Sequence, residues 1–167
     1  MDYTIRPART SDVRAIRRLV DANVASGILL DKATVTLYED IQEFLVADRV
    51  SDGRVIGCGA LHVMWEDLAE IRTIAVDEPC RGEGVGQMMV QALLARAREL
   101  GISRVFVLTF AVKFFGRLGF GEISGEAASP EVYAELLRSY DEGVAEFLDL
   151  DRVKPNTLGN TRMLIRL

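Results

Sequence analysis

The 167-residue chain is long enough for one well-buried domain and short for two. Its 49% hydrophobic and 27% charged residues are typical of a folded soluble protein and argue against a disordered or fibrous one. The net charge of −5 argues against a nucleic-acid partner, which requires clustered Lys and Arg. The two cysteines, Cys58 and Cys80, form neither a disulfide framework nor a metal-ligand spacing, so we expect no metal.

Targeting and membrane signals are also missing from the sequence pattern. Residues 1–7 lack the basic and apolar regions of a signal peptide, and no apolar run approaches the roughly 20 residues of a membrane span. We therefore expect no membrane partner and a reduced, cytoplasmic location.

Hydrophobic periodicity predicts six elements in the first half of the chain. They are a strand over 3–7, helices over 12–23 and 34–42, and strands over 44–50, 54–64 and 68–77. Thr10 or Ser11 is placed to cap the first helix, and Gly27 is placed to end it. Asp52-Gly53 is a hairpin turn signal between two of the strands.

Six further elements are predicted beyond the break at Pro79. They are a helix over 85–100, a strand over 104–108, a helix over 111–118, a strand over 120–123, a helix over 130–140 and a strand over 163–167. The short apolar run at 104–108 is typical of a buried strand with parallel neighbours. The whole pattern predicts a single α+β domain over 1–167, with a mixed central sheet flanked by helices.

The strand over 68–77 leads into a loop with glycines at positions 82, 84 and 86, and a helix follows directly. The free main-chain amides of such a turn and the positive end of the helix favour a phosphate group. A Walker loop is excluded because Gly86 is followed by Gln87 and Met88 instead of Lys and Ser or Thr. A dinucleotide loop is excluded because Gly82 and Gly84 would require a third glycine at Gln87.

The loop R-G-E-G-V-G at 81–86 resembles the R/Q-x-x-G-x-G/A loop of the GNAT superfamily of N-acetyltransferases. A-E-I-R-T-I-A-V-D at 69–77 resembles the fourth strand of that superfamily, and A-V-K-F-F-G-R-L-G-F at 111–120 resembles its A-x-x-F-Y-x-x-x-G-F segment. The order of elements over 3–123 agrees as well. The resemblance implies the single-domain GNAT fold and acetyl-CoA as the acetyl donor.

The same resemblance implies which residues hold acetyl-CoA. Small loop residues let the main chain approach the pyrophosphate, and Arg81 adds a charged contact to phosphate. The main chain of the preceding strand is expected to bond the pantetheine arm and to polarise the thioester carbonyl. The expected cofactor-binding residues are Ile74, Ala75, Val76, Arg81, Gly82, Glu83, Gly84, Val85, Gly86, Gln87 and Phe115.

Transfer to an amine requires a neutral nitrogen, so an α-ammonium group with a pKa of roughly 8 benefits from a general base. The resemblance places this base at Glu70, and Arg72 shares its face of the strand by the period-two alternation. Phe115 stands where the superfamily commonly has a tyrosine proposed to protonate the leaving thiolate. The acid is then water, another tyrosine or none, because a thiolate with a pKa of about 8 to 9 can leave unaided.

The remaining reactive side chains favour direct transfer. His62 is the single histidine of the sequence and is expected in a supporting role. Neither cysteine has a histidine partner that would activate it as a nucleophile. We therefore expect transfer within a ternary complex rather than through an acyl-cysteine intermediate.

A closer resemblance is to the amino-acid N-acetyltransferases, the N-acetylglutamate synthases that open arginine biosynthesis. It rests on G-I-L-L at 27–30, Glu70 in its strand, V-F-V-L-T at 105–109, Phe115, and V-K-P-N-T-L-G-N-T-R-M-L near the end. It points to the short actinobacterial form, which lacks an amino-acid-kinase-like domain, so feedback inhibition by arginine is not assumed.

This resemblance implies glutamate or glutamine as the acceptor, a small-molecule partner. Binding such an acceptor requires cations and hydrogen-bond donors. The candidates are Lys32, Arg72, Asn160 and Arg162. Two alternatives stay open: another amine acceptor (a peptide N-terminus, a polyamine or a drug), or a non-catalytic acetyl-CoA-binding module, which Phe115 permits. We also allow for a homodimer.

Overall fold

The structure is a computed structural model that describes residues 2–25, 29, 32–124, 128–141, 144, 147, 148 and 160–167. The chain forms two compact units, Met1–His62 with Ile71–Arg96 and Val63–Glu70 with Ala97–Leu167. Strands β3 (Val55–Trp65) and β4 (Leu68–Val76) contribute residues to both. Each unit has a hydrophobic core of its own.

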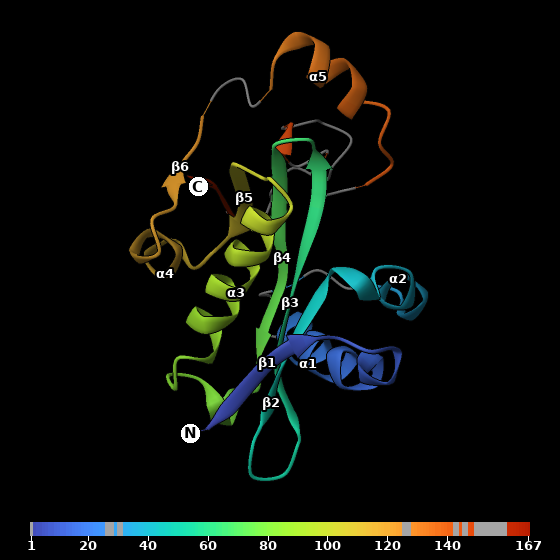
Figure 1. Ribbon diagram of the computed structural model, residues 1–167, viewed down its shortest axis with the longest axis vertical. Coiled ribbons are helices and arrows are strands. Elements are labelled where there is room, and N and C mark those ends of the chain that lie inside the picture. The colour runs from blue at the N-terminus through green and yellow to red at the C-terminus, as the bar shows by residue number, and fades with distance from the viewer. Residues whose placement is uncertain are drawn as a thin grey trace. The chain divides into compact units, whose positions relative to one another are not determined.

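The first unit is built on antiparallel strands. β1 (Tyr3–Pro7) pairs with β2 (Phe44–Arg49), and β2 pairs with β3, in the order β1-β2-β3-β4 (Figure 1). The turn between β2 and β3 contains Gly53 at φ 67°, whose N–H donates to the carbonyl oxygen of Arg49 at 2.8 Å. Glycine adopts this left-handed conformation without steric cost, which is why the Asp-Gly pair predicts a turn here.

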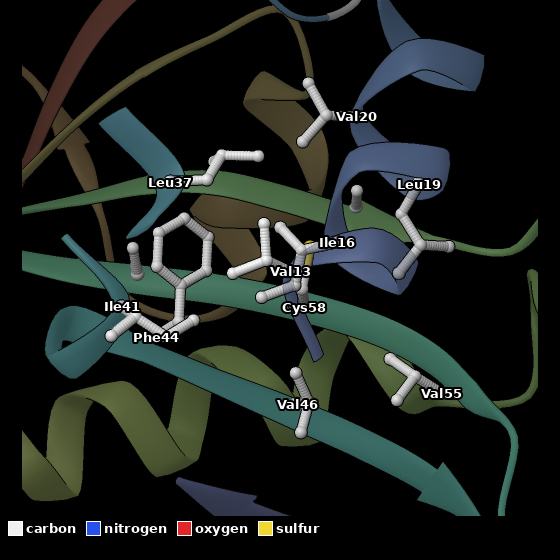
Figure 2. Close-up of a cluster of buried hydrophobic side chains, with 12 residues drawn as sticks. Val13, Ile16, Leu19, Val20, Leu37, Ile41, Phe44, Val46, Val55 and Cys58 are labelled. Carbon is white, nitrogen blue, oxygen red and sulfur yellow. The ribbon is translucent and has the colours of Figure 1, made fainter. Parts of the chain in front are cut away.

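Helices α1 (Val13–Ala25) and α2 (Thr34–Glu39) supply the helical side of the first core. The apolar residues of α1 recur at helical spacing, so they form one buried face. Figure 2 shows this core with Val13, Ile16, Leu19, Val20 and Leu37 from the helices, Ile41 from the turn after α2, and Phe44, Val46, Val55 and Cys58 from the strand region.

The cap of α1 differs from the prediction. Thr10 and Ser11 belong to a 3₁₀ turn, Thr10–Asp12, and neither caps the helix. The side chain that accepts a main-chain hydrogen bond here is Asp12, whose Oδ2 lies 2.7 Å from the donating N–H of Arg9. This bond belongs to a capping box of the 3₁₀ turn that leads into α1, in which Asp12 reaches back to the N–H of Arg9.

The Asp12 carboxylate also joins the helix start to the sheet. Arg6 on β1 donates to it through Nη1 at 2.7 Å, and donates through Nε to Asp48 of β2 at 2.6 Å. The hydrogen bond from Arg6 is the largest cause that lowers the pKa of Asp12, and burial opposes it. The arginine therefore ties three segments of the first unit together.

Helix α3 (Val85–Glu99) packs closely on β3 at two glycines. A Cβ on Gly59 would lie 3.0 Å from Leu93 Cδ1, and a Cβ on Gly57 would lie 3.0 Å from Val85 Cγ1. Glycine inside a strand often marks such a close approach. Because Val85 is the first residue of α3, the helix N-terminus lies directly against β3 at Gly57.

The second unit has the strand order β4-β5-β7-β6. β5 (Arg104–Thr109) runs parallel to β4 and antiparallel to β7 (Thr161–Arg166), which in turn pairs antiparallel with β6 (Gly121–Glu122). The predicted mixed sheet is confirmed. The prediction of parallel neighbours for β5 is wrong on one side, because the final strand returns beside it in the opposite direction.

The core of the second unit lies between its strands and the segment around α5 (Pro130–Leu136). Ser129 caps α5 by accepting from the N–H of Val132 at 3.4 Å. The rings of Phe106 and Phe147 meet edge to face, with centroids 5.2 Å apart. The buried residues are Met64, Leu68, Phe106, Leu136, Val144, Phe147 and Leu148. The remaining helix of this unit is α4 (Val112–Arg117).

Most predicted boundaries lie within one or two residues of the observed ones. The helix predicted over 34–42 is divided, since α2 ends at Glu39 and a 3₁₀ turn, Ile41–Glu43, follows. The helix predicted over 130–140 ends at Leu136. Gly27, the predicted end of α1, lies outside the described residues.

Replacement of Asp12 by Asn should lower the free energy of unfolding by about 1–3 kcal/mol at neutral pH, because the charged cap and the bond to Arg6 are lost. The folded-state pKa of Asp12 is lowered, so its contribution is complete above the unfolded value of about 4 and is lost as the pH falls below it. Urea unfolding at neutral pH and at about pH 3 measures the difference, which should shrink in acid.

The matched control for this change is Asp21→Asn, which breaks an exposed i,i+4 pair with Arg17 on α1. It should change stability by less than about 0.5 kcal/mol. A destabilisation by Asp12→Asn that stays constant between the two pH values contradicts the role given to its charge.

Replacement of Gly59 by Ala should lower the free energy of unfolding by about 1–3 kcal/mol, because the new methyl group overpacks against Ile74 of β4 and Leu93 of α3. Gly116→Ala in α4 is the control, since a Cβ there meets no atom within 4 Å, and it should be neutral or slightly stabilising. Thermal unfolding followed by circular dichroism compares them. Equal midpoints for the two variants would show that the contact at Gly59 is not tight.

Candidate active site

Strand β4 contains a local distortion at Thr73, which has φ 59°, a conformation that residues other than glycine rarely adopt. The Thr73 Oγ1 is buried and has no hydrogen-bond partner among the described residues. The parallel register with β5 ends at Glu70, although β4 continues to Val76. Strained backbone is concentrated at functional sites, so this part of β4 is a candidate.

Ile74 and Ala75, which follow Thr73, pack their side chains within the first unit. Ala75 belongs to its hydrophobic core, and Ile74 Cδ1 lies 2.5 Å from the position that a Cβ on Gly59 would take. Ala75 is buried, whereas Ile74 and Val76 are partly exposed, so the main chain of Ala75 is the part of that residue that could contact a ligand. The predicted role of this strand in binding a pantetheine arm depends on the same groups.

The glycine loop joins β4 to α3, and residues 81–84 are exposed, whereas Val85 is buried. Gly82 and Gly84 have φ values of +84° and +83°. The N–H of Met88 donates to the carbonyl oxygen of Gly84 at 3.0 Å, so the helix begins immediately after the loop. The amides of the first helical residues then have no acceptor within the helix, which makes this turn suitable for a phosphate group.

Asn23 on α1 forms a hydrogen bond with Arg81 of the glycine loop. Arg81 Nη2 donates to Asn23 Oδ1 at 3.2 Å, and Asn23 Nδ2 donates to the carbonyl oxygen of Leu19 at 2.7 Å. Asn23 is only 4% exposed. Asn23 was not among the predicted site residues; the available signal was a polar residue at helical spacing from the buried Ile16 and Leu19.

Glu70, the predicted general base, lies in the part of β4 that pairs with β5, opposite Phe106. The residue is 4% exposed, so it is not a surface carboxylate. A buried polar side chain on a strand requires a specific reason, and a catalytic role is one such reason. The catalytic assignment of Glu70 stays a prediction.

Phe115 lies in α4 of the second unit and is 4% exposed. Its ring meets Phe114 and Phe120 edge to face, with centroids 5.1 Å and 5.2 Å away. The ring therefore has a packing role of its own within the second unit, and its predicted contact with the cofactor stays a prediction.

The four predicted acceptor-binding residues divide between the two units. Lys32 and Arg72 belong to the first unit, where both act electrostatically on Asp40. Asn160 and Arg162 belong to the second unit, at the start of β7. Arg162 donates through Nη2 to the carbonyl oxygen of Phe147, so part of its guanidinium group supports the fold.

Two acidic residues that interact electrostatically near Lys32 and Arg72, namely Asp40 and Glu43, were not among the residues predicted from the sequence. Burial and the charge of Glu43 raise the pKa of Asp40, and Lys32, His62 and Arg72 oppose the rise. Glu43 Oε1 lies 2.7 Å from His62 Nδ1. The available signal was the single histidine, because an imidazole in a strand commonly has a carboxylate partner.

Neither cysteine has the surroundings of a nucleophile. Cys58 is fully buried, and desolvation raises the pKa of its thiol to about 12. Cys80 is 1% exposed. A catalytic cysteine requires an accessible thiolate, so these two environments argue against an acyl-cysteine intermediate.

Within the described ranges, no group of three or more His, Cys, Asp or Glu side chains is arranged to hold a metal ion. The same residues include no helix that is both long and apolar enough to cross a membrane.

The family profile "Acetyltransferase (GNAT) family" matches residues 20–120, and the chain belongs to this family. An amino-acid acetyltransferase of Mycobacterium tuberculosis is 58% identical over 164 residues, which cover 98% of this chain and 94% of the relative. The family and the mixed-sheet fold expected from the sequence are confirmed. The matched residues draw on both units, and the assignment of 1–167 to one domain stays a prediction.

Two solved structures are similar over the whole chain. A crystal structure of a Mycobacterium tuberculosis protein in complex with CoA and NLQ has a TM-score of 0.93 at 58% identity, covering 98% of this chain and 99% of that chain. N-acetylglutamate synthase from Neisseria gonorrhoeae, complexed with coenzyme A and N-acetyl-glutamate, has a TM-score of 0.78 at 25% identity. That match covers 100% of this chain and 35% of the other.

Replacement of Gly84 by Ala should raise the KM for acetyl-CoA by about tenfold, because an L-residue at φ +83° is strained and shifts the loop amides. Gly53→Ala is the matched control, since Gly53 has φ 67° but lies in the β2–β3 turn. It should leave that KM unchanged. Steady-state kinetics at varied acetyl-CoA concentrations measure this KM in both variants. An unchanged KM in Gly84→Ala would contradict the proposed role of the loop in binding acetyl-CoA.

Proposed function

We propose that this protein transfers the acetyl group of acetyl-CoA to the α-amine of L-glutamate or L-glutamine, the first step of arginine biosynthesis. The observation that carries the proposal is the near full-length match, at 58% identity, to an amino-acid acetyltransferase. The structural likeness to a synthase complexed with coenzyme A and N-acetyl-glutamate supports the same reaction.

The glycine loop has the features that a pyrophosphate requires. Gly82 and Gly84 allow the main chain to approach closely, and the first amides of α3 point out of the helix N-terminus. Arg81 is proposed to add a charged contact to phosphate in exchange for its bond to Asn23. The residues proposed to bind acetyl-CoA are the predicted set: 74–76, 81–87 and Phe115.

Glu70 is proposed to accept the proton of the acceptor ammonium, directly or through a water, so that the neutral nitrogen attacks the thioester carbonyl. The main chain of 74–76 is proposed to polarise that carbonyl. The C–N bond forms, the C–S bond breaks, and the sulfur leaves as a thiolate, which at a pKa of about 8 to 9 needs no acid from position 115. The second proton of the attacking nitrogen passes to water or to the departing thiolate. Transfer is direct, since both thiols are buried.

The acceptor is proposed to bind through Lys32, Arg72, Asn160 and Arg162. Cations and amide donors suit the carboxylate groups of an amino acid. The partner is therefore a small molecule. A homodimer and a cytoplasmic location, both expected from the sequence, complete the proposal.

Pure protein with acetyl-CoA and a panel of amines should release free thiol fastest with glutamate or glutamine. Glu70→Gln should lower kcat by about 10²–10⁴-fold, because the base is lost while the shape of the side chain is kept. Glu66→Gln, an exposed carboxylate in the β3–β4 turn, is the control and should retain full activity. Thiol release no faster than in buffer would overturn the proposal.

Other results of the same panel distinguish the alternatives. Faster release with a peptide N-terminus, a polyamine or a drug amine would assign a different acceptor. Binding of CoA without thiol release from any amine, and without an effect of Glu70→Gln, would indicate a non-catalytic module.

A further inference from the structure

The turn after α2 carries two carboxylates within the first unit. The N–H of Glu43 donates to the carbonyl oxygen of Asp40 at 2.9 Å, so the two residues belong to one 3₁₀ turn. His62 Nδ1 on β3 lies 2.7 Å from Glu43 Oε1. An ionised carboxylate accepts hydrogen bonds and cannot donate them, so the imidazole N–H is the donor.

The two oxygens of the Glu43 carboxylate have different surroundings. Oε1 accepts from His62, whereas Oε2 is buried and has no hydrogen-bond partner within the described part of the chain. An unsatisfied buried acceptor costs about 1–3 kcal/mol, and more when it is charged. The hydrogen bond that connects this turn to His62 of β3 uses only Oε1. A purely structural role for Glu43 therefore does not explain why Oε2 is buried without a partner. A donor from outside the chain would satisfy it.

The charges that act on Asp40, the other carboxylate of this turn, indicate what kind of donor fits. Burial and the charge of Glu43 raise the pKa of Asp40, while Lys32, His62 and Arg72 lower it. Two carboxylates and two permanent cations are therefore electrostatic neighbours. An α-amino acid carries the matching combination, because its ammonium and carboxylate groups are attached to one carbon. The ammonium group suits a carboxylate, and the carboxylate group suits lysine and arginine.

We propose that Glu43 is a specificity-determining residue for the acceptor, and that its Oε2 accepts a hydrogen bond from the α-ammonium group. Lys32 and Arg72 bind the carboxylate end, and His62 is a positioning residue that holds Glu43 through Oε1. The inference rests on the proposed function and adds the recognition of the amine to it. It concerns the ammonium ion, the form in which the acceptor arrives at neutral pH; the general base removes the proton before attack.

Kinetics of Glu43→Gln test the proposal. The KM for the acceptor should rise by about 10- to 100-fold, because a hydrogen bond between charged groups is lost. The KM for acetyl-CoA should stay within about twofold, a split that general destabilisation would not produce. Glu39→Gln, an exposed carboxylate at the end of α2, is the matched control and should change neither constant. An unchanged acceptor KM in Glu43→Gln overturns the proposal.

A comparison of the affinities for glutamate and glutarate measures the contribution of the ammonium group to binding. Calorimetry with CoA present should show that the wild-type protein binds glutamate more tightly than glutarate, which lacks the amine. Glu43→Gln should bind the two alike. A preserved preference for glutamate in the variant would assign amine recognition to another residue. Wild-type protein that turns over neither glutamate nor glutamine would instead refute the proposed function, so the two failures are distinguishable.

His62→Gln provides a second variant that leaves the charge of Glu43 in place. It removes the imidazole that holds Oε1, so the acceptor KM should rise, by less than in Glu43→Gln, while the KM for acetyl-CoA is unchanged. An acceptor KM equal to the wild-type value in both variants would show that the pair is structural.

Discussion

The close packing of α3 on β3 is the constraint on which the candidate cofactor site depends. Gly57 and Gly59 provide no side chain, so Val85 and Leu93 of the helix can approach the strand. Val85 is both the first residue of α3 and the buried end of the glycine loop. The position of the helix N-terminus, and with it the direction of the loop amides, is therefore set by the core of the first unit.

Strand β4 combines this core with the main chain that is proposed to bind the pantetheine arm. Ala75 packs among the core residues, and the carbonyl oxygen of Thr73 lies 3.6 Å from Cys58 Sγ. Thr73 itself adopts a left-handed conformation in mid-strand. Since the surrounding core holds the strain in place, the main chain beyond Thr73 is kept in one geometry, which is what preorganised binding of a thioester requires.

The acceptor site proposed for the first unit relies on a balance of charges more than on any single cation. Lys32 and Arg72 act on Asp40, whose pKa is raised first by burial and then by the charge of Glu43. Arg162, in the second unit, is partly committed to the carbonyl oxygen of Phe147. Side chains that all carry the same charge would attract one of the two charged groups of an amino acid, the ammonium or the carboxylate, and repel the other. Opposite charges on neighbouring residues avoid this problem, at the cost of burying polar atoms.

The sequence by itself determined the fold class, most element boundaries, the family and the phosphate-suited loop, because these depend on local periodicity and on short motifs around positions 70, 82–86 and 115. Only the tertiary structure placed Asn23 against Arg81 and Glu43 against His62, residues that are 58 and 19 positions apart. The direction of the strand beside β5 and the pairing of Arg6 with Asp48 were likewise decided by tertiary contacts. Such pairings depend on which elements pack together, and no local pattern in a single sequence carries that information.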